Sequence, residues 1–209
     1  LSSEHRVIEQ VLDCLEKMAD QAGREHAVDA ESARDAIDFL RSFADGCHHG
    51  KEEAHLFPAL EAKGLPRNGG PTGVMIHEHE TGRGHVRGMD EALAAAAAGE
   101  AGAAARFARH ARDYIALLRE HIHKEDHCLF SMADQMLTPE EQAALLTRFD
   151  QVEIHHMGEG VHERYLELAN RLVALTARQE TLDVVVMTRQ AAFRALNQDK
   201  LEAVFVVTE

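Results

Sequence analysis

Hydrophobic residues recur every three or four positions along most of the first 177 residues, which is the spacing of one face of an α-helix. Gly64–Gly73 interrupts the pattern as a loop, and Gly99–Gly102 interrupts it as a short turn. Thr138 followed by Pro139 and Glu141 predicts a capping box with proline at the first helical position. We expect helices at about 2–21, 29–57, 73–98, 103–136 and 139–177. Four long helices with short connections predict an all-α, up-down-up-down four-helix bundle with an additional C-terminal helix.

The last thirty residues differ in character from the rest of the chain. Two β-branched runs, Leu182–Met187 and Ala203–Thr208, flank a helical stretch at Arg189–Leu196. This pattern fits a β-α-β unit, a continued helix of poor propensity, the start of a second domain, or a tail that packs on the bundle. We therefore divide the chain into a bundle domain at 1–178 and a C-terminal tail at 179–209 whose structure and role the sequence leaves open.

Net charge and cysteine usage limit the range of binding partners and indicate the cellular compartment. The chain has 22 basic and 36 acidic residues, a net charge of −14. Nucleic acid and anionic membrane surfaces are therefore poor partners. The three cysteines lie far apart and include no CxxC pair, which argues against a disulfide framework. No secretory signal or transmembrane run is visible. We expect a cytoplasmic protein, and the sequence leaves its oligomeric state open.

The chain holds 15 histidines, well above an average share, and several are paired with glutamate four residues later. The clearest pairs are His48 with Glu52 and His121 with Glu125; His49 with Glu53 repeats the first pair one residue on, so the register of this pair stays open. A spacing of four places both side chains on one helical face. Such a face suits two ligands of one metal, or a carboxylate that reaches a second metal.

The positions of four histidines match across the expected bundle. His5 lies 16 residues before the first turn and His48 lies 19 after it, while His79 lies 19 before the third turn and His121 lies 18 after it. At about 1.5 Å of rise per residue, the two histidines of each pair lie at the same height along the bundle axis to within roughly 5 Å. The sequence thus predicts one layer of metal ligands across four helices: His5, His48, Glu52, His79, His121 and Glu125.

This ligand set also constrains the metal. Imidazoles and carboxylates without thiolates exclude iron–sulfur clusters and cysteine-bound structural zinc. Two bridging carboxylates with imidazole ligands favour two iron ions, with manganese, zinc or a mixed pair as the alternatives.

Four stretches together resemble a known family, the hemerythrin-like or HHE cation-binding domain, in its bacterial branch. They are EHRVIEQVLDCLE (4–16), HHGKEEAHLFPAL (48–60), HEHETGR (77–83) and HIHKEDHCLF (121–130). The resemblance covers about residues 1–172 and includes GEGVHERY (158–165). It implies terminal histidine ligands to two irons, two bridging glutamates, and a bridging oxo or hydroxo group. Carried over by position, the terminal ligands are His5, His48, His79 and His121, and the bridges are Glu52 and Glu125.

The chain departs from the oxygen-carrying hemerythrins at one point. Those proteins use five histidines, two of them one turn apart on the third helix, whereas here Met75 and Arg83 stand four residues before and after His79. The remaining set resembles the four-histidine, two-glutamate pattern of the repair-of-iron-centres proteins and of the iron-sensing F-box hemerythrin domain. A fifth ligand stays open, and the candidates are His77, His155, Glu159 and His162.

The resemblance implies a non-heme di-iron protein that binds or reacts with O2, peroxide or NO, with peroxide detoxification as one specific form. The alternative is an iron or oxygen sensor, or an iron-handling module, that performs no turnover. A third reading is an interaction domain with a structural metal. Whether the chain is an enzyme stays open, and no residue is assigned a catalytic role.

Overall fold

A computed structural model of the chain describes residues 1–154, 158, 160–179, 181, 188 and 190. The chain divides into two compact units, Leu1–Leu172 and Val173–Glu209. The predicted tail elements at 182–187 and 203–208 lie outside the described residues, and the domain boundary near 178 stays a prediction. None of the described helices combines the length and the hydrophobicity that crossing a bilayer requires.

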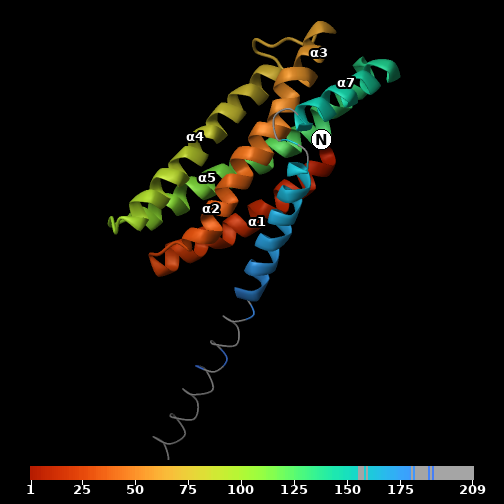
Figure 1. The fold of residues 1–209 in the computed structure, drawn as a ribbon. Coiled ribbons are helices and arrows are strands. Elements are labelled where there is room, and N and C mark those ends of the chain that lie inside the picture. The colour runs from red at the N-terminus through yellow and green to blue at the C-terminus, as the bar shows by residue number, and fades with distance from the viewer. Residues whose placement is uncertain (155–157, 159, 180, 182–187, 189, 191–209) are drawn as a thin grey trace, which may run out of the picture. The chain divides into compact units, whose positions relative to one another are not determined.

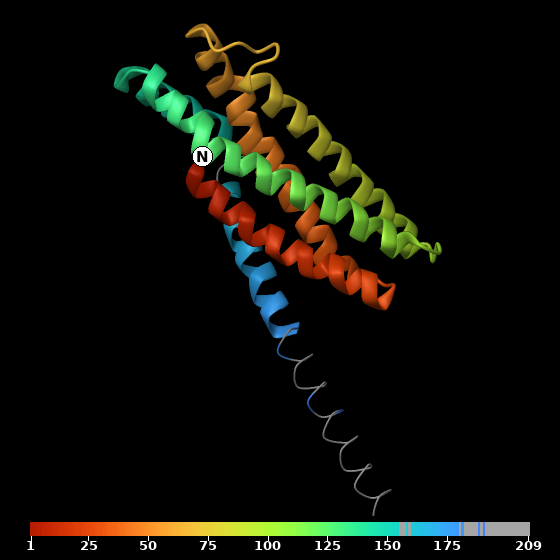
Figure 2. The same cartoon turned by 180° about the vertical axis from the view of Figure 1, so that it is seen from behind.

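Four long helical segments form the bundle, as the periodicity predicts (Figures 1 and 2). The first is α1 (Ser2–Glu25), and the third is α4 (Pro71–Ala97). The second runs through α2 (Ala30–Phe39), η1 (Leu40–His49), η2 (Glu52–Leu56) and α3 (Phe57–Ala62). The fourth runs through α5 (Ala103–Lys124), η3 (Glu125–Leu129) and α6 (Phe130–Met136). The predicted all-α bundle is confirmed.

The segments labelled η are π-helices, and they are the main local departure from the α-helical pattern. They occur in the second and fourth segments, at the level of the predicted ligands. One consequence is that the second helix continues to Ala62, whereas the sequence predicts its end before Pro58. Pro58 lies at the start of α3, directly after the π turn of η2. Because the π turn changes the hydrogen-bond register just before Pro58, the helical rod continues past a residue that has no N–H to donate.

The predicted fifth helix is broken. Thr138 forms the expected capping box with Glu141, and α7 (Pro139–Val152) follows it. Gly158 and Gly160 then have φ angles of 86° and 77°, in the left-handed region that favours glycine, and residues 161–179 are helical again. A single helix from 139 to 177 is therefore wrong, because these glycines end one helical stretch and begin another.

Two apolar clusters fill the bundle, one on each side of the predicted ligand layer. The larger cluster includes Leu12, Phe43 and Phe107, and the smaller one includes Phe57 and Leu129. Between them, buried polar side chains cross the interior at one level. Hydrophobic packing on both sides holds the four segments at fixed spacing and excludes water from this level.

Candidate metal centre

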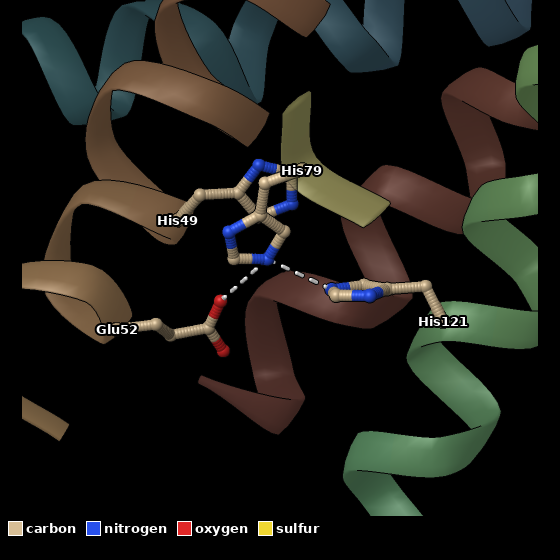
Figure 3. Close-up of side chains that lie close together, drawn as sticks. All are labelled: His49, Glu52, His79 and His121. Carbon is tan, nitrogen blue, oxygen red and sulfur yellow. Dashed lines mark hydrogen bonds and ion pairs between the residues drawn. The ribbon is translucent and has the colours of Figure 1, made fainter. Parts of the chain in front are cut away.

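Five histidines and two glutamates converge in the buried layer, and they form two overlapping groups. In each group, one ligand atom from every residue lies within 4.8 Å of the others. The two-histidine half consists of His5, His48, Glu52 and Glu125. The three-histidine half consists of His49, Glu52, His79 and His121, whose side chains point toward one another in Figure 3. All seven side chains are buried.

Glu52 and Glu125 each face both halves. One oxygen of Glu125 lies 3.2 Å from Nε2 of His5, and the other lies 3.2 Å from Nε2 of His121. The oxygens of Glu52 lie 3.5 Å from Nε2 of His48 and 3.6 Å from Nε2 of His79. Each carboxylate thus lies between two sets of imidazoles, which is the placement that a bridge between two metal ions needs.

The central atoms lack the partners that buried polar groups need. All four carboxylate oxygens of Glu52 and Glu125 are buried without a hydrogen-bond partner. Within the two halves, Nε2 of His5 lies 2.9 Å from Nε2 of His48, and Nε2 of His79 lies 3.0 Å from Nε2 of His121. Two ligands at about 2.1 Å from one metal and about 90° apart are separated by about 3.0 Å. The donor set and its spacing therefore fit two cations.

Every central histidine has a carboxylate on its outer nitrogen, Nδ1. The distances are 2.9 Å from His5 to Asp126, 2.7 Å from His48 to Glu4, 3.3 Å from His49 to Asp45, 2.7 Å from His79 to Glu53 and 3.0 Å from His121 to Glu78. A carboxylate at this distance accepts the Nδ1 proton and leaves the Nε2 lone pair free. This is the tautomer that a metal-binding imidazole uses.

These outer carboxylates are themselves paired with cations. Arg6 binds Asp126, Lys51 binds Glu4, Lys124 binds Glu78, and Arg83 binds both Asp45 and Glu53. Lys51 is buried and also contacts Glu153 at 2.8 Å. The pairing keeps each outer carboxylate ionised and limits the rotation of its side chain.

Four of the five outer carboxylates come from a different helical segment than the histidine they hold. Glu4, which precedes His5 on α1, holds His48 of η1, and Glu78, which precedes His79 on α4, holds His121 of α5. Adjacent helical residues point about 100° apart, so the residue beside an inward-facing ligand faces the neighbouring helix. The sequence analysis missed these residues, although their position next to the predicted ligands is a signal that finds them.

The sequence analysis also missed His49, which it treated only as an alternative register. An α-helix places His48 and His49 on different faces, but η1 is a π-helix, which holds more residues in each turn. Both imidazoles therefore point inward, and the His49 ring stacks on His79 with centroids 3.8 Å apart. Glu52 lies in the centre, and Glu53 lies outside it against His79 and Arg83. The adjacent histidines flanked by Gly46 and Gly50 are the sequence signal, because glycine weakens the α-helix there.

Two of the other candidates for a fifth ligand, His77 and His162, are not in the centre. His77 is exposed, while His155 and Glu159 lie outside the described residues. His162 is partly buried and lies 3.9 Å from Glu4, in a separate group with Glu153. Among the described residues, His49 supplies the fifth imidazole of the centre.

Burial and charge shift the pKa values of the central side chains in opposite directions. Burial and the nearby Glu125 raise the pKa of Glu52 well above its usual range. Burial also acts to raise the pKa of Glu125, but the close imidazoles of His121 and His5 outweigh it and hold the value below the usual range. Two buried carboxylates this close do not both ionise easily without added positive charge. A bound cation supplies that charge.

Comparison with known proteins agrees with this geometry. The family model of the hemerythrin HHE cation binding domain matches residues 1–133, well over half of the chain and every residue of the centre. The chain belongs to the hemerythrin family. Its hemerythrin domain thus has a cation-binding fold, and the two buried His/Glu groups within residues 1–133 can hold cations.

Proteins similar to this chain occur in mycobacteria. Uncharacterised proteins of Mycobacterium tuberculosis and Mycobacterium bovis are 24% identical to it over 159 residues. The match covers 76% of this chain and 62% of each relative, so the chain spans about three fifths of their length. No solved structure matches it closely enough to add to this comparison.

Proposed function

We propose that this protein binds two iron ions, one in each half of the centre, and uses them to react with O2, peroxide or NO. Glu52 and Glu125 are the proposed bridges, and the five histidines are the proposed terminal ligands. The observation that carries the proposal is the group of four buried carboxylate oxygens without hydrogen-bond partners, faced by imidazoles whose outer nitrogens are already held. Imidazole with carboxylate, in the absence of thiolate, suits iron and also admits manganese or zinc.

The two halves offer different numbers of nitrogen ligands. Three imidazoles belong to the three-histidine half, whereas His5 and His48 alone belong to the two-histidine half. An ion in the two-histidine half consequently keeps more of its coordination positions for water or a small ligand. We place the reaction with small oxygen or nitrogen species in this half. A bridging oxo or hydroxo group is part of the proposed resting centre.

When bound, the iron pair supplies redox chemistry and an electrophilic site for small ligands. The chain itself performs three tasks. The outer carboxylates hold the Nδ1 protons of the histidines and fix the ring orientations. The apolar clusters on both sides of the layer exclude bulk water, which strengthens the electrostatic interactions of the centre. The bridging glutamates balance positive charge in an interior that offers them no other partner.

The test is metal analysis combined with visible absorption of protein purified in air, followed by titration with peroxide and NO. We expect about two irons per chain and oxygen-to-iron charge-transfer bands that change on titration. Catalytic consumption of peroxide supports an enzyme, and a stoichiometric spectral change without turnover supports a sensor or an iron-handling module. Zinc alone, or no metal, contradicts the proposal.

A further inference from the structure

Arg83 of α4 lies beside the three-histidine half, and all three nitrogens of its guanidinium are bonded. Its Nε donates to both carboxylate oxygens of Asp45, at 2.9 and 3.0 Å. Its Nη2 lies 2.8 Å from Oε1 of Glu53, and its Nη1 lies 2.6 Å from Glu80. The side chain of Arg83 is only 24% exposed. One guanidinium of α4 therefore joins a carboxylate of η1 to a carboxylate of η2.

Each of these two carboxylates also holds a histidine of the three-histidine half. Oε1 of Glu53, which accepts from Arg83, lies 2.7 Å from Nδ1 of His79. Oδ1 of Asp45 lies 2.7 Å from Nη2 of Arg83 and 3.3 Å from Nδ1 of His49. The rings of His49 and His79 stack with centroids 3.8 Å apart (Figure 3). The contacts thus form a closed loop that begins and ends at Arg83.

This closed loop has no counterpart at the other histidines of the centre. The other three outer carboxylates are each paired with a different cation, as Asp126 beside His5 is paired with Arg6. In the part of the chain that the structure describes, Arg83 is the one cation that holds two outer carboxylates. Loss of Arg6 therefore affects the support of one imidazole, whereas loss of Arg83 affects the support of two.

The contact between Asp45 and His49 depends most on this arginine. At 3.3 Å it is the longest of the five contacts between an outer carboxylate and a histidine, and both residues lie on η1. Asp45 contacts Arg83 more closely and through both oxygens. A planar guanidinium that binds a carboxylate in this way fixes the orientation of the carboxylate as well as its charge. Arg83 therefore determines where Asp45 meets the ring of His49.

We propose that Arg83 is a positioning residue that makes His49 and His79 act as one unit. While Arg83 binds Asp45 and Glu53, both rings are held in the orientation that a metal needs, and when this arginine is lost both rings are released together. The inference rests on the proposed function in that the two imidazoles are metal ligands. It adds that metal binding in the three-histidine half depends on a residue that belongs to neither ligand group.

The first experiment records the imidazole N–H signals of the whole chain, freed of metal, by NMR. We expect the Nδ1 protons of His49 and His79 to be protected from exchange with water, because a carboxylate holds each of them. Arg83→Gln should remove this protection from both rings, while Arg6→Gln should change the signal of His5 at most. The proposal is overturned if protection survives in Arg83→Gln, if only one of the two rings loses it, or if Arg6→Gln releases the same two rings.

The second experiment measures zinc binding by competition with a metal-binding dye, so its result does not depend on iron or on its reactions. Arg83→Gln should weaken one of the two zinc sites at least about tenfold and leave the other unchanged. Arg87→Gln is the matched control, since Arg87 is exposed one turn further along α4, and it should bind zinc as the unmodified chain does. Two unchanged zinc sites in Arg83→Gln overturn the proposal. An unmodified chain that binds no metal contradicts the proposed function instead, and the NMR result on Arg83 still stands.

A conservative variant separates the charge of Arg83 from its shape. Arg83→Lys keeps the positive charge but lacks the planar fork, so it should hold one carboxylate and protect one ring only. Two protected rings in Arg83→Lys would show that charge alone is sufficient, which overturns the role of the guanidinium. Thermal unfolding of each variant, compared with that of Arg87→Gln, establishes that the changes are local. Arg83→Lys carries the test if Arg83→Gln does not fold.

Discussion

The two halves of the centre are built from the same kinds of residue, but they differ in how the chain supplies them. The two-histidine half takes one histidine from α1 and one from η1, each held by a carboxylate from another segment. The three-histidine half adds His49, whose carboxylate, Asp45, lies on the same helical segment at a longer distance of 3.3 Å. Both halves take residues from π-helical segments, but only the three-histidine half takes the residue adjacent to His48 on the same segment.

This difference shows how a bundle gains a ligand without a new helix or a longer motif. Because a π turn holds more residues than an α turn, it brings two adjacent histidines inward from one segment. The added ligand reaches one half only, so the two proposed metal positions become unequal. An unequal pair leaves one position more open to a small ligand, which is why we place the reaction in the two-histidine half.

Removing a bridge should affect both halves together and have the largest effect. Glu52→Gln keeps the size of the side chain but removes its charge and one acceptor oxygen between the two sets of imidazoles. We expect most of the metal to be lost from both halves, as measured by metal analysis after dialysis. Glu120→Gln is the control, since Glu120 is exposed on α5 and outside both groups, and it should retain the metal. Full metal content in Glu52→Gln would show that this glutamate does not bridge.

Removing His49 should affect only the three-histidine half. We expect His49→Gln to lower the metal content to about one ion per chain, because the two-histidine half keeps all its ligands. His77→Gln is the control, since His77 is exposed on α4 and outside both groups. Metal analysis and visible absorption together report the change. If His49→Gln binds as much metal as the unmodified chain, the stacked imidazole is packing and not a ligand.

Changing the outer carboxylates should weaken each half separately. Asp126→Asn removes the acceptor charge beside His5, and Glu78→Gln removes the one beside His121. Loss of such a partner typically costs about 10–100-fold in metal affinity. We expect Asp126→Asn to weaken the two-histidine half and Glu78→Gln to weaken the three-histidine half, in competition with a metal-binding dye. The same loss from the same position in both variants would contradict the separation of the halves.

The metal-free protein should respond to pH in opposite directions through the two halves. Burial lowers the pKa of His48 to about 4 in the folded chain. Burial also opposes the charge of His121, but the close carboxylates of Glu125 and Glu78 raise its pKa to about 9. His48 makes the folded chain lose stability as pH falls from about 6.5 to 4, and His121 makes it lose stability as pH rises from about 6.5 to 9.

Urea unfolding of the metal-free protein at several pH values measures both trends. Each histidine should change the free energy of unfolding by on the order of 2 kcal/mol across its range. His121→Gln should remove the loss between pH 6.5 and 9 and leave the acid side in place. An unfolding free energy that stays constant from pH 6.5 to 9 in the unmodified chain would contradict the charge assigned to His121.

Much of the fold follows from local signals in the chain. Regular spacing of hydrophobic residues defines the four long segments, and Thr138 with Glu141 marks the start of α7. The prediction that the second helix ends before Pro58 is wrong. The effect of proline depends on the hydrogen-bond register of the backbone before it, and the π turn of η2 changes that register. The prediction of one unbroken fifth helix is also wrong. Hydrophobic residues keep their helical spacing past Gly158 and Gly160, but the backbone conformation of these two glycines breaks the helix.

The layer of candidate ligands was predictable because helical rise converts sequence distance into height. His5, His48, His79 and His121 lie in one layer with Glu52 and Glu125, as their distances from the turns predict. Their role as metal ligands remains a prediction that the experiments above test. Counting along the chain places an acidic residue beside several ligands but does not reveal which imidazole on another segment it holds, as with Glu4 and His48 or Glu78 and His121.

The sequence by itself determined the bundle, the level of the polar layer within it and the kinds of donor present there. These properties depend on periodicity and on residue type, which are local and can be counted. Only the tertiary structure decided that His49 joins the layer, that each imidazole has a carboxylate on its outer nitrogen, and that the two halves are unequal. The physical reason is that these features depend on the hydrogen-bond register of a helix and on contacts between helices, and neither is written in the spacing of residues along one segment.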